Sequence, residues 1–132
     1  MIDSQPVRAA DTVPWASRGW DNAEKDGGRK RHIAVDATGL VLAMVITAAS
    51  VQDRDADRPL LWNLSRCCTR VRLAWADAGY AGKLATWAAS LKIQLEIVRK
   101  RDAHAFEVLL PRSWVIERTL CLDHAHRRCA RD

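Results

Sequence analysis

The hydrophobic and polar positions divide the first half of the chain into two apolar runs joined by a turn. Leu40–Ala48 is a continuous apolar run with β-branched members, which predicts a strand near 41–48 that is buried on both faces. A shorter run, Ile33–Val35, precedes it, and Asp36-Ala37-Thr38-Gly39 between the two is typical of a turn. The pattern therefore predicts a hairpin of strands near 31–36 and 41–48.

The next segment has helical spacing, with one apolar face formed by Leu60, Leu61, Leu64, Cys67 and Cys68. This predicts a helix near 57–68 that Asp55 or Asp57 caps and in which Pro59 lies near the first turn. Because both cysteines belong to the apolar face, we expect them in or near the core.

Shorter patterns predict the remaining elements. A strand is expected near 72–76, ending at Asp77, followed by a helix near 83–91 and a half-exposed edge strand near 93–98. A last helix is expected near 113–130. At the front, Ile2–Val7 would add one extended strand, and 8–28 predicts a long mobile loop because it carries Gly, Asp, Ser and charge without a period.

The order of these elements favours one α/β domain. Three strands come first, and strands and helices then alternate, which is the order of a ribonuclease H-like mixed sheet flanked by helices. The 132 residues fit one such domain. In that fold, acidic residues from strand 1, strand 4 and a late helix converge on metal ions.

Charge adds a candidate partner. The chain carries a net charge of +5, and Arg outnumbers Lys by 16 to 5. The planar guanidinium group suits phosphate, so nucleic acid is a plausible partner. No apolar run reaches the ~18 residues of a membrane span and no signal peptide is visible, so we expect a cytoplasmic, nucleoid-associated protein.

Several motifs in one order resemble the catalytic domain of bacterial insertion-sequence transposases of the Asp-Asp-Glu type. The specific ones are Trp75-Ala76-Asp77-x-Gly79-Tyr80-Ala81-Gly82 and Glu117-Arg118-Thr119. They accompany Ile2-Asp3-Ser4-Gln5, Gly28-Arg29-Lys30-Arg31-His32 and Val51-Gln52-Asp53. The resemblance covers nearly the whole chain, so 1–132 is expected to be a partial catalytic domain of this family.

The resemblance implies that Asp3, Asp77 and Glu117 are catalytic carboxylates that bind Mg²⁺ or Mn²⁺. Two such ions can activate the attacking oxygen and stabilise the leaving one in a displacement at phosphorus. Because no covalent protein–DNA intermediate is needed, no nucleophilic Ser or Tyr is required. The implied activity is nicking of DNA 3′ ends and strand transfer into target DNA.

The basic residues are candidates for the DNA path, with a solvated surface as the alternative for each. The family pairs its glutamate with basic residues further along the same helix, which points to Arg118, Arg127 and Arg128. Arg29, Lys30 and Arg31 form a second basic cluster, and Arg99, Lys100 and Arg101 form a third.

Other carboxylates compete with the three implied ones. We interpret Asp36 as a turn residue and Asp53 or Asp55 as a loop or cap residue. The alternative for Asp77 is a turn residue, and the alternative for Asp3 is a polar residue at a frayed chain end. On a helical wheel Glu117 shares one face with Cys121, His124 and Arg128, opposite an expected core stripe of Val115, Thr119, Leu122 and His126. A glutamate on that face is compatible with a catalytic residue and equally with a solvated surface residue.

Cys121, His124, His126 and Cys129 have a spacing that suggests zinc ligands. On one straight helix they point to opposite sides, so four tetrahedral bonds from that helix are impossible. A zinc site is therefore not predicted, although His124, on the face of Glu117, could lie near the metal site.

Two classes of function stay open. Only Met1 and Ile2 precede Asp3, and an upstream DNA-recognition region is absent, so strand 1 is expected to be incomplete and the chain to be truncated at both ends. The first class is a transposase catalytic domain that acts on element ends and target DNA with an upstream reading-frame product or as a homo-oligomer. The second is a catalytically inactive, DNA-associating remnant or partner subunit of a full-length transposase. A free-standing nuclease of the same fold is a third reading.

Overall fold

The computed structural model describes residues 1–10, 12–14, 17–21, 25–77, 80, 82–98, 115–122 and 125. Its elements, in chain order, are the strands β1 (Ile2–Arg8), β2 (Gly19–Asp21), β3 (Asp26–Val35) and β4 (Val41–Ala48), helix α1 (Asp53–Cys67), strand β5 (Leu73–Asp77), helix α2 (Lys83–Ser90) and strand β6 (Gln94–Val98). Residues 115–122 are also helical. The predicted mixed α/β class is confirmed. None of the helices in these ranges is long and apolar enough to cross a membrane.

β3 is the central strand of an antiparallel sheet. β1 pairs along one side of it, from Ile2 opposite Ala34 to Arg8 opposite Gly28, and β4 pairs along the other side. β2 joins the start of β3 beyond the end of β4, with Gly19 also opposite Gly28. A side chain at position 28 would overlap the carbonyl oxygen of Val7, so only glycine allows the strands to approach this closely.

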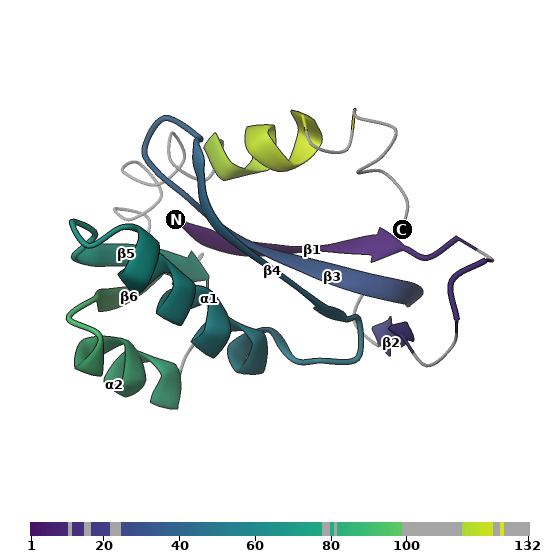
Figure 1. The fold of residues 1–132 in the computed structure, drawn as a ribbon, viewed down its shortest axis with the longest axis horizontal. Helices are drawn as coiled ribbons and strands as arrows, with labels where there is room; N and C mark the ends of the chain where they lie inside the picture. The colour runs from purple at the N-terminus through teal and green to yellow at the C-terminus, as the bar shows by residue number, and fades with distance from the viewer. Residues whose placement is uncertain are drawn as a thin grey trace.

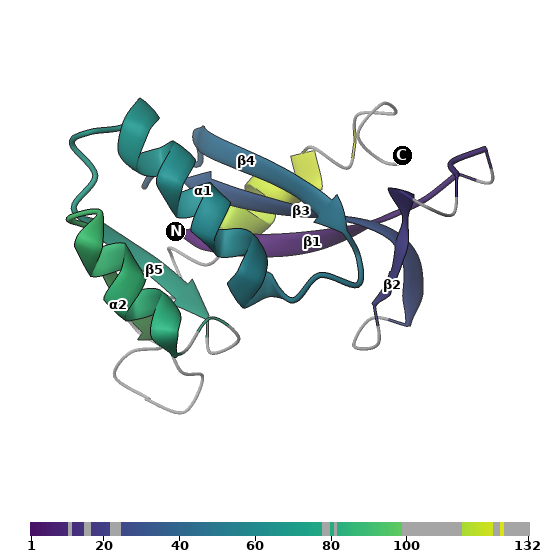
Figure 2. The ribbon, with the colours of Figure 1, turned by 60° about the horizontal axis from the view of Figure 1, so that its bottom comes forward.

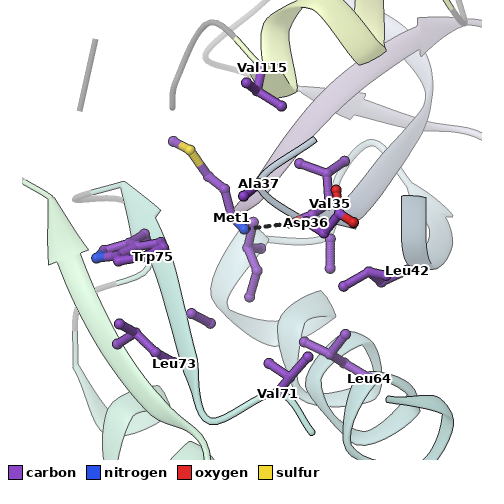
Figure 3. Close-up of a pocket in the computed structure, with 13 residues that line it drawn as sticks. Met1, Val35, Asp36, Ala37, Leu42, Leu64, Val71, Leu73, Trp75 and Val115 are labelled. Carbon is purple, nitrogen blue, oxygen red and sulfur yellow. Dashed lines mark hydrogen bonds between the residues drawn. The ribbon is translucent and has the colours of Figure 1, made fainter. Parts of the chain in front are cut away.

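A second, parallel sheet is formed by β5 and β6, which α2 connects. β5 lies beside β1, although no ladder joins these two strands within the described residues. A cavity of about 200 Å³ lies at the seam between the two sheets, and Figure 3 shows its mainly apolar lining. There the amino group of Met1 donates a hydrogen bond to the carbonyl oxygen of Val35 at 2.7 Å, which extends the β1–β3 ladder by one residue.

Helices cover the antiparallel sheet from both sides, as Figures 1 and 2 show. α1 packs with α2 and the second sheet into the larger core, in which the most buried residues of α1 are Leu60, Leu61 and Leu64. On the opposite face, Ile116 and Leu120 of helix 115–122 pack on Ile33 and Val35 of β3. The alternation of β3 between these two cores explains why this strand is apolar on both faces near its end.

Two sequence predictions about strands need correction. Region 8–28 is not one loop: it contains β2 and the first residues of β3, which pair with each other. β4 is not buried on both faces, since Met44 and Ile46 are exposed. β4 lies at the edge of the sheet. On the face that carries Met44 and Ile46, helix 115–122 covers only one end of the sheet. The expected strands near 72–76 and 93–98 are confirmed within one residue.

The helices also differ from the expectation in detail. α1 begins at Asp53 after Gln52, without a side-chain cap, so Asp55 and Asp57 are inside the helix and do not cap it. Pro59 therefore lies beyond its first turn. Of the two cysteines expected in or near the core, Cys67 is exposed, whereas Cys68 is half-buried and packs against the larger core.

Helix 115–122 buries a different stripe from the predicted one. Ile116, Thr119 and Leu120 are buried, whereas Leu122 is exposed. The rest of the predicted helix, and the zinc-like residues beyond Cys121, lie outside the described residues.

The packing of α1 predicts that two adjacent residues, Leu61 and Trp62, contribute very differently to the free energy of unfolding. Leu61 is fully buried and Trp62 is 48% exposed. Leu61→Ala should lower the free energy of unfolding by about 2–5 kcal/mol, because it leaves a cavity in the larger core. Trp62→Ala should change it by only about 0.5 kcal/mol. Urea unfolding followed by circular dichroism measures both, and equal losses for the two variants would contradict the packing of α1.

Candidate active site

Asp3 lies on β1 at the edge of the sheet that faces β5. Its Oδ1 accepts a hydrogen bond from the backbone N–H of Ser4 at 2.8 Å. Burial, together with repulsion from the carboxylates of Asp77, Asp53 and Glu117, raises the pKa of Asp3 to about 6 against the lowering effect of that hydrogen bond. Repulsion of this kind requires these three carboxylates to lie within electrostatic range of Asp3.

Different elements bring the other two predicted residues to Asp3. Asp77 is the last residue of β5, and the contact of β5 with β1 brings its exposed carboxylate toward this edge. Glu117 is on the exposed side of helix 115–122, whose buried side rests on β3. Asp3 is therefore the carboxylate that both Asp77 and Glu117 repel.

Two further carboxylates, Asp53 and Asp57, approach from the start of α1. Asp57 is completely buried, and neither of its carboxylate oxygens has a hydrogen-bond partner among the described residues. Burial raises its pKa to about 8, with added repulsion from Asp53, Asp77 and Asp3. Tyr80 is buried near Asp57, and burial together with this neighbour raises the pKa of its hydroxyl group. We call Asp3, Asp53, Asp57, Asp77 and Glu117 the acidic cluster.

The sequence analysis missed Asp57 because a helix start near 57 makes it a cap. A signal was present: Asp57 precedes Leu60, Leu61 and Leu64 by three, four and seven positions, so it belongs to the apolar face of α1. An acid on a buried face is costly unless it has a function or a partner. Asp53, which the sequence predicts to be a loop or cap residue, is the first residue of α1 and forms an ion pair with Lys30.

The basic residues near the sheet are partly used inside the fold. The Lys30 ammonium group lies 3.1 Å from Asp53 Oδ1, and both Lys30 and Arg31 are buried. Arg31 donates a hydrogen bond to Gln5 Oε1 at 3.0 Å. Arg29 is half-buried and donates from Nε to the carbonyl oxygen of Ser17 at 3.3 Å. Lys30 and Arg31 therefore do not present an open basic surface in this conformation.

Arg118 holds the turn between β3 and β4. Its guanidinium group donates to the carbonyl oxygen of Thr38 at 2.8 Å, and Thr119 Oγ1 donates to that of Gly39 at 2.9 Å. The predicted turn role of Asp36 is confirmed, since its Oδ1 accepts hydrogen bonds from Thr38 and Leu40. These contacts fix the helix that carries Glu117. Arg99, Lys100, Arg101, Arg127, Arg128 and His124 lie outside the described residues.

Within the described ranges, no three His, Cys, Asp or Glu side chains lie close enough together to hold one metal ion. The carboxylates of the acidic cluster are thus coupled through charge without forming a closed ligand set. Their chemistry nevertheless suits a hard divalent cation, which prefers carboxylate oxygens and retains waters.

The raised pKa of Asp3 predicts a pH-dependent effect of its neutralisation. An acid whose pKa is raised to about 6 on folding favours the folded state below the unfolded pKa of about 4, and this contribution is lost as pH rises through 6. In EDTA, Asp3→Asn should therefore raise the melting temperature at pH 8 and have little effect at pH 4.

The comparison with wild type at each pH is needed because His32, with a pKa lowered by burial, gives the opposite trend. An equal shift of the melting temperature at both pH values would show that Asp3 is not desolvated and repelled as described.

Comparisons with known proteins identify the family of the chain. Residues 1–121 match the family described as "Transposase DDE domain". Over 108 residues, the chain is 32% identical to the Burkholderia cepacia protein named "Putative transposase for insertion sequence element IS402", with 76% of this chain covered. It spans about half of that protein, 51% of its length. No solved structure matches the chain. With the match over residues 1–121, the resemblance seen in the sequence is confirmed, and the chain belongs to the transposase DDE domain family.

Proposed function

We propose that this chain is the catalytic domain of an insertion-sequence transposase, with Asp3, Asp77 and Glu117 as its catalytic carboxylates. The observation that carries the proposal is the coupling of Asp3 to both of the others, although they come from three elements far apart in sequence. In a fold without a use for them, such like charges would only destabilise the folded chain.

The arrangement of strands supports a ribonuclease H-like fold. β4, β3 and β1 lie side by side, and β5 runs next to β1 with β6 beyond it. This is the order in which the first and fourth long strands of such a fold present their acidic residues at one place. Helix 115–122 supplies the third carboxylate from the face of the sheet opposite α1 (Figure 1).

Asp3, Asp77 and Glu117 would hold the divalent metal ions, Mg²⁺ or Mn²⁺. When bound, such ions activate the attacking oxygen and stabilise the leaving oxygen in a displacement at phosphorus. The protein's own contribution is positional: β1, β5 and the packed helix hold the three carboxylates on rigid elements. Asp57, buried behind them and protonated near neutral pH, adds little negative charge to the site.

Two displacements make up the proposed reaction. In the first, water attacks the phosphorus at the element boundary, the bond to the 3′ oxygen breaks, and a 3′-hydroxyl is released. In the second, that hydroxyl attacks a phosphodiester of target DNA, and a target 3′-hydroxyl leaves. The partners are therefore DNA, namely element ends and target, together with an upstream reading-frame product or a second copy of the chain.

Metal binding should be visible without any DNA. Mg²⁺ relieves the repulsion around Asp3 and binds only the folded chain, so it should raise the melting temperature. At a concentration 100 times the Kd, stabilisation is about 2.7 kcal/mol, which corresponds to several degrees in a chain of this size. Asp77→Asn should remove most of that shift. Differential scanning calorimetry with and without Mg²⁺ at pH 7.5 measures it, and a full shift in the variant would exclude Asp77 as a ligand.

Cleavage requires all three carboxylates. Glu117→Gln and Asp77→Asn should abolish Mg²⁺-dependent nicking of a DNA that carries the element ends, in this chain or in one fused to the upstream frame. Asp55→Asn is the matched control, because Asp55 is an exposed acid in the first turn of α1.

Gel analysis of labelled DNA reports the nick. If Glu117→Gln cut at the wild-type rate, the assignment of this glutamate would be wrong. If the wild-type chain bound DNA and never cut it, even when fused, the alternative of an inactive DNA-associating subunit would be supported.

A further inference from the structure

Trp20 is a large exposed aromatic residue at the end of the antiparallel sheet. It is the middle residue of β2, and 57% of its side chain is exposed. It pairs with Gly27 of β3, and a Cβ atom at Gly27 would lie 3.7 Å from the Trp20 ring. The ring of Trp20 therefore lies over Gly27 on this face of the strand pair, at a distance that would leave room for a Cβ atom. It presents an exposed, flat apolar surface at this end of the sheet.

The strand register puts Trp20 on the same face of the sheet as Asp3. Trp20 is opposite Gly27 and Asp3 is opposite Ile33, and these β3 residues are six positions apart (33 − 27), an even number. At about 3.3 Å per residue, the separation is about 20 Å. This corresponds to about six nucleotides of one DNA strand. β2 lies at the end of the sheet away from the N-terminus, as Figure 2 shows.

Arginines accompany the exposed ring. Arg18 precedes β2 directly, and Arg29 is two positions beyond Gly27 on the same face of β3. The hydrogen bond from Arg29 to the carbonyl oxygen of Ser17 ties this strand to the segment that leads into β2. Exposed aromatic rings on strands that also carry arginines are typical of surfaces that bind nucleic acid with unpaired bases, because every base can stack and every phosphate is an anion.

We propose that Trp20 is a base-stacking subsite, which binds an unpaired base of the DNA strand that enters the acidic cluster. This rests on the proposed function, because it takes DNA as the substrate. The ring would hold a base about six nucleotides from the phosphate at Asp3, and so favours DNA whose strands are separated near the cut. Fully paired DNA offers no free base face and gains nothing from Trp20.

The test compares two DNA probes of equal length and sequence. One is a fully paired 30-base-pair duplex and the other contains a four-base mismatched bubble, each labelled with fluorescein. Wild-type chain should bind the bubble more tightly in an anisotropy titration. Trp20→Ala should weaken bubble binding by about 5- to 100-fold and leave duplex binding unchanged. Trp20→Phe, which keeps a stacking ring, should restore most of the difference.

Trp62→Ala is the matched control. Trp62 is also an exposed tryptophan, but it belongs to α1, which covers the opposite face of the sheet. It should leave both affinities unchanged. If Trp20→Ala bound both probes like wild type, or if Trp62→Ala lost the bubble preference equally, the stacking proposal would be wrong.

The outcomes separate this proposal from the proposed function. A wild-type chain that binds neither probe at low salt would overturn DNA as the substrate and the stacking proposal with it. A chain that binds both probes equally, with Trp20→Ala unchanged, overturns the stacking proposal alone. A change of sedimentation coefficient in Trp20→Ala without a change in DNA selectivity would assign the ring to a protein interface and overturn the proposal.

Discussion

The pairing of β3 with strands on both of its sides is the constraint from which the rest of the structure follows. Because β1 and β4 are both in antiparallel register with it, every residue of β1 has a defined face and height. Alternate residues of β3 then enter the core under α1 or the core under helix 115–122. Asp3 and Trp20 lie on one face because both are positioned by pairing with this one strand.

The acidic cluster lowers the stability of the folded chain, because it groups and partly buries like charges at one place. Burial and mutual repulsion raise the pKa of Asp3 to about 6 and that of Asp57 to about 8, so both carboxyl groups take up protons at a higher pH than usual. A stable core of Leu60, Leu61 and Leu64 next to Asp57 supports this arrangement. Strain of this kind concentrates at functional sites, where a bound cation can relieve it.

The arginine-rich composition suggests a DNA-binding surface, but several of the basic side chains form contacts inside the fold. Lys30 neutralises Asp53, Arg31 binds Gln5, and Arg118 anchors the turn after β3. These contacts support the elements that carry the acidic cluster. The net charge of +5 still favours an anionic partner, whereas the individual basic residues cannot be assigned to it by sequence position.

The sequence by itself determined the class of fold, the order of its elements apart from β2, the Asp36 turn and the family. Apolar periodicity marks β4, α1 and α2, because each periodicity is a local property of the chain. The boxes around Asp77 and Glu117 also mark the family without any structure. Local patterns failed at Asp57, Lys30 and Leu122, whose burial depends on which neighbour covers them. Only the tertiary structure brought Asp53 and Asp57 to Asp3, placed Lys30 on Asp53, and put Trp20 on the face of Asp3. Burial, long-range repulsion and strand register depend on residues far apart in the chain, and no periodicity within one segment records them.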